Sequence, residues 1–105
     1  KELKNNKAIE KEILLFHLQQ AAEKFIKSSI SYNGHKYPHI HDLEKLVKLC
    51  ETKNIALPDF IMDITPLTPF ADEFRYDVPI KDIDVSEFYK LVNKLKNYVQ
   101  KIFKD

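Results

Sequence analysis

Three polar side chains near the start of the chain lie at helical spacing. His17, Gln20 and Lys24 are separated by three and then by four residues. A helix would therefore align their imidazole, amide and ammonium groups along one strip of its surface. Such a strip can face solvent, or it can contact an anionic ligand.

Arg75 is the only arginine of the chain, and it is followed by Tyr76 and surrounded by carboxylates. In one interpretation it forms ion pairs with these carboxylates and fixes the end of a helix. In the other it contacts a phosphate group or stacks on a base, and the strip on the first helix joins it from across the protein. The second interpretation predicts one site for a phosphate or a base, formed by His17, Gln20, Lys24, Arg75 and Tyr76.

The remaining residues that could carry chemistry favour structural roles. A proline-containing stretch gathers several histidines without a cysteine or a helical histidine pair, so we interpret it as a solvated connection that ends in a helix cap. No neighbour in the sequence would activate the thiol of Cys50. A single glycine excludes a glycine-rich phosphate loop. The sequence thus predicts no catalytic residue, no metal and no cofactor. The proline-containing stretch interpreted here as a solvated connection comprises His35, His39, His41 and Asp42.

The polar strip requires a helix, and the apolar pattern predicts one over residues 12–32. Its apolar face is broad, as expected for a central helix. Phe16 and Ile13 lie on the other side and indicate a second contact. Residues 1–11 are polar and predict a frayed lead-in, while Gly34 supplies a helix end. The predicted buried face comprises Leu14, Leu15, Leu18, Ala21, Ala22, Phe25, Ile26 and Ser29.

Four further helical segments are predicted. A helix over residues 42–53 starts at the capping carboxylate of Asp42, and a short segment of one or two turns falls within residues 55–66. A hydroxyl followed by proline starts a helix over residues 68–76. The last helix holds an apolar period over residues 84–102. No alternating strand pattern occurs, so the fold class is all-α.

Length and composition fit one small helical domain over residues 1–105. Hydrophobic residues make up 44% of the chain and charged residues 31%, which disfavours both disorder and a turn-rich β-sandwich. No apolar run approaches the roughly 20 residues that cross a membrane. The single cysteine indicates a reducing, cytoplasmic setting. Because the chain begins with Lys1 rather than Met, we expect a fragment, in which an N-terminal helix before residue 12 is short, fused to the predicted helix, or partly missing.

The net charge of +1 conceals an uneven distribution. Residues 57–87 carry eight acids and only two basic residues, whereas residues 88–104 carry five lysines and no acid. One interpretation is a solvated lysine face beside acidic loops. The other is a basic patch for phosphate or RNA, which a single arginine and a pI near 8.0 support only weakly.

Three short motifs occur in an order and at a spacing that resemble the HEPN domain family. They are FHLQQAAEKFIK at residues 16–27, HDLEKL at residues 41–46 and LTPFADEFRY at residues 67–76, with a Tyr-Asn-Gly turn after the first. The resemblance implies an up-and-down bundle of four or five helices that forms a homodimer. It also implies a nucleotide-binding or interaction module that acts with a partner nucleotidyltransferase in a toxin–antitoxin-like pair.

The same resemblance raises two alternatives. Many members of the wider superfamily are metal-independent ribonuclease toxins, marked by an arginine followed four to six residues later by a histidine. That motif is absent here, since no histidine follows Arg75; a ribonuclease would need another constellation, such as His17 with Lys24 and Arg75. The second alternative is a structural interaction module without a ligand, for which Phe16, Phe103 and Tyr98 are candidate partner contacts. Binding is favoured over catalysis.

Overall fold

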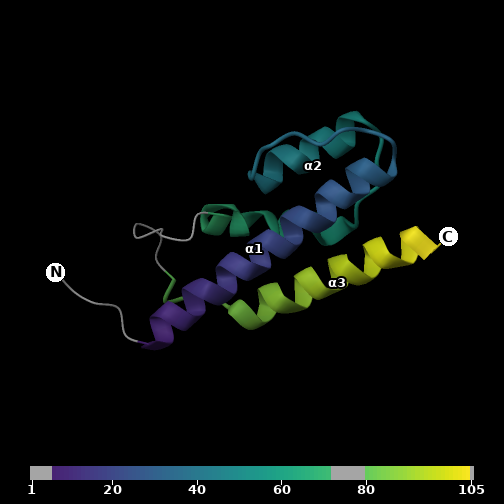
Figure 1. Ribbon diagram of the computed structural model, residues 1–105. Helices are drawn as coiled ribbons and strands as arrows, with labels where there is room; N and C mark the ends of the chain where they lie inside the picture. Colours follow the sequence, from purple (N-terminus) through teal and green to yellow (C-terminus); the bar gives the residue numbers. More distant parts are fainter. Residues whose placement is uncertain (1–5, 72–79, 105) are drawn as a thin grey trace.

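The regular structure of the protein is helical throughout the part of the chain that can be described. A computed structural model describes residues 6–71 and 80–104, and no strand occurs in these two ranges. Three α-helices and two 3₁₀-helices follow one another in the chain (Figure 1). The prediction of an all-α bundle is therefore confirmed. The elements are α1 (Asn6–Tyr32), α2 (Leu43–Thr52), η1 (Asp59–Asp63), η2 (Thr65–Ala71) and α3 (Val85–Lys104).

The two long helices, α1 and α3, lie side by side and run in the same direction (Figure 1). Lys11 near the start of α1 donates a hydrogen bond to the carbonyl oxygen of Lys81, just before α3. At the other end, the ring of Tyr32 stacks on that of Phe103. The chain returns along α1 through the extended connection at residues 33–42, and again through η1 and η2. As far as residues 6–71 and 80–104 show, both returns are made by non-α segments.

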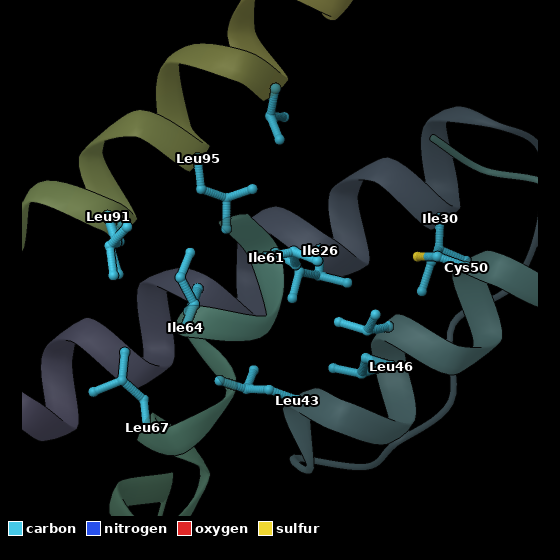
Figure 2. Packing of buried hydrophobic residues seen from close by; sticks show 14 of the residues in the cluster. Ile26, Ile30, Leu43, Leu46, Cys50, Ile61, Ile64, Leu67, Leu91 and Leu95 are labelled. Atoms are coloured by element: carbon cyan, nitrogen blue, oxygen red, sulfur yellow. The ribbon is translucent and has the colours of Figure 1, made fainter. Parts of the chain in front are cut away.

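The hydrophobic core is formed by α1, α2, α3 and the two 3₁₀-helices together (Figure 2). Ile26 and Ile30 of α1 lie beside Leu46 and Cys50 of α2, while Leu95 of α3 approaches from the opposite side. All five side chains are fully buried. Each fully buried aliphatic side chain of this size contributes about 1.5–3 kcal/mol relative to an exposed position, so this cluster is the main source of stability.

The 3₁₀ form of η1 and η2 follows from the spacing of their apolar residues. Ile61, Ile64, Leu67 and Phe70 recur every third residue and are all buried. This period matches the three residues per turn of a 3₁₀-helix, which places such side chains on one line. The amide of Ile64 donates to the carbonyl of Ile61, and that of Leu67 to the carbonyl of Ile64. The repeat therefore points one continuous edge of the segment into the core.

The predicted helix at residues 68–76 can be compared with the structure only as far as Ala71, and up to there the two differ. The segment up to Ala71 belongs to η2, which already begins at Thr65, and residues 72–76 lie outside the described part. Pro66 and Pro69 have no amide hydrogen to donate, so an α-helical ladder through them would lose bonds. The hydroxyl of Thr68 accepts a hydrogen bond from the amide of Leu43 at 2.9 Å. This hydroxyl therefore joins η2 to α2.

The end of α1 and the start of α2 were predicted closely. The start of α1 was not, since this helix begins at Asn6 rather than at residue 12. Asp42 caps α2 by accepting from the amide of Lys45 at 3.1 Å, and Gly34 adopts a φ of +83° after α1. In α1, however, the buried seam lies one residue later than expected, and Leu14 is 52% exposed. The shift arises because two polar residues occupy the seam, where an apolar pattern cannot reveal them. The buried residues of α1 are Leu15, Gln19, Ala22, Glu23, Ile26, Ser29 and Ile30.

Replacing Leu95 by alanine should destabilise the protein by roughly 2–5 kcal/mol, because it removes a fully buried side chain and leaves a cavity between α3 and the rest of the core. Urea unfolding followed by circular dichroism measures the change. Met62→Ala is the control, since loss of an apolar side chain at a half-exposed position outside the core should cost within about 0.5 kcal/mol. Equal losses for the two variants would contradict the assigned core.

Candidate functional site

An open groove of about 700 Å³ lies over the C-terminal half of α1. α1 provides most of its lining, and residues 37–39 of the extended connection and the end of α3 complete it. The groove exists because the connection runs back along α1 and because α3 ends beside Tyr32. Its lining residues are Gln20, Glu23, Lys24, Lys27, Ser28, Ser31, Tyr32, Tyr37, His39 and Phe103.

Cationic and hydroxyl groups line the α1 side of the groove. Lys24 is exposed, and it forms no ion pair with any residue within 6–71 and 80–104. Lys27 lies one turn further on and is partly covered, with its Nζ 5.4 Å from the centre of the Tyr37 ring. The hydroxyl groups of Ser28 and Ser31 face the same groove. These groups can together contact an anion through charge and hydrogen bonds.

Aromatic side chains line the rest of the groove. The rings of Tyr32 and Phe103 are stacked, with centroids 4.6 Å apart and planes inclined by 23°. The hydroxyl of Tyr32 donates to the carbonyl oxygen of Ile102 at 3.5 Å, which further joins the ends of α1 and α3. Tyr37 stands on the connection opposite and is also exposed. Exposed rings of this kind can stack on a planar heterocycle.

A polar network centred on the buried carboxylate of Glu23 adjoins the groove. Glu23 Oε2 lies 2.8 Å from Lys27 Nζ and 2.8 Å from His41 Nδ1, while Oε1 accepts from Gln19 Nε2 at 3.1 Å. Gln19 Nε2 also donates to the carbonyl oxygen of His41 at 3.1 Å. The network therefore fastens the connection to α1 through both the backbone and the ring of His41.

The network determines the ionisation of Glu23. Burial alone would raise the pKa of this carboxyl, but the hydrogen bonds from Lys27, His41 and Gln19 outweigh it. The pKa of Glu23 consequently lies below its ordinary value of 4.5. Glu23 is thus a carboxylate at neutral pH, and Lys27 offsets its charge so that it does not dominate the groove.

Three of the five residues predicted to contact a nucleotide lie in the described part of the chain, and two of these three line the groove. Gln20 and Lys24 line the groove, whereas His17 is exposed one turn earlier and packs edge-on against Phe16, with ring centroids 5.5 Å apart. Gln20 Nε2 donates to Gln19 Oε1 at 2.8 Å. The two other predicted contacts, Arg75 and Tyr76, lie outside the described residues. The strip that the sequence indicated therefore enters the groove only with its second and third members.

Most other groove residues were not found from the sequence. Glu23 and Lys27 are four residues apart, a spacing that signals a helical ion pair but not a buried one. His39 and His41 were interpreted as parts of a solvated connection, yet His39 lines the groove and His41 contacts Glu23. Extended segments carry no helical period, so nothing in the sequence indicated which of their side chains would face α1.

The remaining chemical candidates take no part in the groove. Cys50 is buried among apolar residues, and burial, with a smaller effect from Glu51, raises the pKa of its thiol to about 11. It is therefore a neutral core thiol at neutral pH. Within residues 6–71 and 80–104, no three histidine, cysteine or acidic side chains are grouped to hold a metal ion. None of the helices in these ranges is long and apolar enough to cross a membrane.

Glu23→Gln should lower the free energy of unfolding at pH 7 by roughly 1.5–3 kcal/mol, because it removes hydrogen bonds to a buried charge. A carboxyl whose pKa is lowered by folding stabilises the protein above its unfolded-state value, here 4.5, and loses that effect as the pH falls through the folded-state value. The difference between wild type and variant should therefore shrink below about pH 4.5. Urea unfolding across this range measures it. The exposed Glu51→Gln is the control, and a pH-independent difference for Glu23→Gln would contradict this account.

Comparison with known proteins identifies the family. The family model described as the HEPN domain matches residues 2–102. No curated protein and no solved structure matches the chain. The family match spans nearly the whole sequence and agrees with the all-α fold. The chain therefore belongs to the HEPN domain family.

Proposed function

We propose that the protein is a nucleotide-binding module and that the groove over α1 is its binding site. The observation that carries this proposal is the meeting, in one groove, of the free ammonium of Lys24 with the exposed rings of Tyr32, Tyr37 and Phe103. A nucleotide needs both features, because its phosphate requires cationic or hydrogen-bonding groups and its base requires a flat apolar surface. Membership of the HEPN domain family, which includes nucleotide-binding and ribonuclease-type modules, supports the same class of ligand.

In the proposed complex the phosphate lies beside Lys24 and Lys27, within reach of the hydroxyl groups of Ser28 and Ser31. Lys27 already donates to Glu23, but an ammonium group has three hydrogens and can donate to a ligand as well. The base stacks on the aromatic residues at the ends of α1 and α3. Arg75 and Tyr76 remain proposed contacts from outside the described part of the chain.

A ribonuclease activity has less support than binding. The constellation that would replace the missing motif includes His17, which lies outside the groove and packs on Phe16. A ribonuclease also needs groups that accept and donate protons at a bound phosphodiester. The proposal is therefore a binding module, and a structural interaction module without a ligand is the outcome to distinguish from it.

We further propose that the protein forms a homodimer and acts with a partner nucleotidyltransferase, as a toxin–antitoxin-like pair. The support within the fold is an apolar surface at the N-terminal half of α1, where Ile9, Ile13 and Leu14 are exposed and Phe16 is half-buried. Phe103, another predicted partner contact, is exposed at the groove, whereas Tyr98 packs against the core.

A nucleotide that binds the groove should raise the thermal unfolding temperature. At 100 times its dissociation constant, a ligand that binds only the folded state stabilises by about 2.7 kcal/mol, or roughly 10 °C or more for a domain of this size. The panel comprises nucleoside mono- and triphosphates and the dinucleotide adenylyl-adenosine. Lys24→Ala should reduce the shift without changing the unfolding temperature of the free protein, since Lys24 is exposed.

Lys48→Ala on α2 is the matched control, because Lys48 is equally exposed and lies away from the groove. Arg75→Ala tests the contact proposed from the sequence. An absence of any shift across the panel would overturn nucleotide binding and favour the structural interaction module. A shift that Lys24→Ala and Lys48→Ala reduce equally would place the site elsewhere.

The dimer proposal predicts a mass near twice 12.4 kDa in sedimentation equilibrium. Ile13→Glu should give a monomer, because a charge at the centre of the exposed apolar surface cannot be buried in an interface without a large cost. Tyr89→Glu is the control, since Tyr89 is exposed on α3. A wild-type protein that is still monomeric at about 100 µM would contradict the proposal, because a dimer that dissociates at this concentration is weaker than a typical specific one.

A further inference from the structure

The contact between Glu23 and His41 places a proton-binding group beside the groove. The side chain of Glu23 is only 9% exposed, whereas that of His41 is 65% exposed. An ionised carboxylate can only accept hydrogen bonds, so the 2.8 Å contact requires a proton on Nδ1 of His41. The other ring nitrogen, Nε2, is therefore the one that gains or loses a proton.

The charge of the network depends on that nitrogen. With His41 neutral, the carboxylate of Glu23 and the ammonium of Lys27 cancel, and the three linked side chains carry no net charge. With His41 protonated, the same three side chains carry one positive charge. Glu23 and Lys27 both line the groove, so this charge lies one hydrogen bond from the site where the phosphate is proposed to bind.

Charged groups from several elements surround His41. Asp42 follows it as the cap of α2, and Glu44 lies in the first turn of that helix. The start of α2 carries about half a positive charge, and Lys45 adds a further positive charge there. From η2, the neutral hydroxyl of Thr68 accepts from the amide of Leu43. The carboxylate of Glu23 is in direct contact with the ring, and the ammonium of Lys27 lies 2.8 Å from the same carboxylate oxygen.

His39 is the other imidazole that could respond to pH at this site. It lines the groove two residues before His41, but no hydrogen bond to a described residue fixes its ring. His17 is exposed and lies outside the groove. Of these three histidines, His41 alone is held by a carboxylate that itself lines the groove.

We propose that the groove binds a phosphodiester anion together with a proton on His41, so that its affinity for nucleotides rises as the pH falls from 8 toward 6. The proposal rests on the proposed function, because it takes the groove to be the nucleotide site. Imidazole is the side chain that changes charge in this range. By linkage, an anion that binds the protonated state more tightly must also increase proton uptake on binding.

Isothermal titration calorimetry with adenylyl-adenosine tests the proposal on the wild-type protein. The phosphodiester of this probe keeps one negative charge between about pH 6 and pH 8, so a pH effect comes from the protein. Titrations in two buffers of different ionisation enthalpy give the number of protons taken up. We expect uptake near pH 7 and roughly three- to tenfold tighter binding at about pH 6 than at about pH 8.

His41→Gln should abolish the proton uptake and the pH dependence, because its amide can still donate to Glu23 but cannot gain a charge. His17→Gln, at a histidine outside the groove, should retain both. His39→Gln changes the groove wall and can weaken binding, but it should retain the number of protons taken up per bound probe, which keeps the test decisive should His41→Gln fail to fold. Uptake that persists in His41→Gln, or that vanishes in His17→Gln or in His39→Gln with bound probe, would overturn the role of His41.

The outcomes also separate this inference from the proposed function. Binding of adenylyl-adenosine without proton uptake would overturn the linkage to His41 and leave nucleotide binding intact. Failure of adenylyl-adenosine to bind at any pH, with mononucleotides still bound, would overturn the inference alone. Failure of every nucleotide in the panel to bind would overturn both.

Discussion

The arrangement around α1 depends on the hydrogen bonds and the ion pair that the carboxylate of Glu23 forms. It lies within the buried seam of the longest helix, where an unpaired charge would cost several kcal/mol. Lys27, His41 and Gln19 satisfy it, and no buried side-chain nitrogen or oxygen among the described residues lacks a partner. Because His41 belongs to the extended connection, satisfying this charge also holds the connection against α1. The position of the groove wall that carries Tyr37 and His39 therefore follows from the need to pair a buried charge.

The parallel course of α1 and α3 imposes a second constraint, since the chain must travel back along them, and among the described residues no long α-helix makes a return. The first return is the extended connection, whose carbonyl at His41 is paired by Gln19. The second is the pair of 3₁₀-helices, which rise about 2.0 Å per residue and so cover more length than an α-helix of equal size. Prolines that would disrupt an α-helix are tolerated there, and Pro69 lies inside η2.

How much could be predicted from the sequence depended on whether burial followed an apolar period. α2 and α3, both predicted from such a period, bury residues that follow it, including Leu46 and Leu95. In α1 the seam contains Gln19 and Glu23, which a hydrophobic pattern assigns to the surface, so Leu14 was placed inside when it lies outside. Only some of the residues that line the groove were predicted, for a related reason. Helical spacing identified Gln20 and Lys24, but the facing wall is extended, and its contacts arise from pairing with Glu23 rather than from a repeat.

The ends of α1 and α3 determine how a nucleotide would lie in the groove as proposed. Both helices end there, and each carries about half a negative charge at its C-terminus. No basic residue occupies the last turn of α1 to offset it, whereas Lys101 lies in the last turn of α3. A phosphate at the end of α1 would therefore be repelled, whereas one to two turns earlier it meets the unpaired ammonium of Lys24 and the ammonium of Lys27 that is shared with Glu23. The uncharged base is the part of the ligand suited to the helix ends, where Tyr32 and Phe103 are stacked. The same geometry that attracts a phosphate thus also orients the ligand along α1.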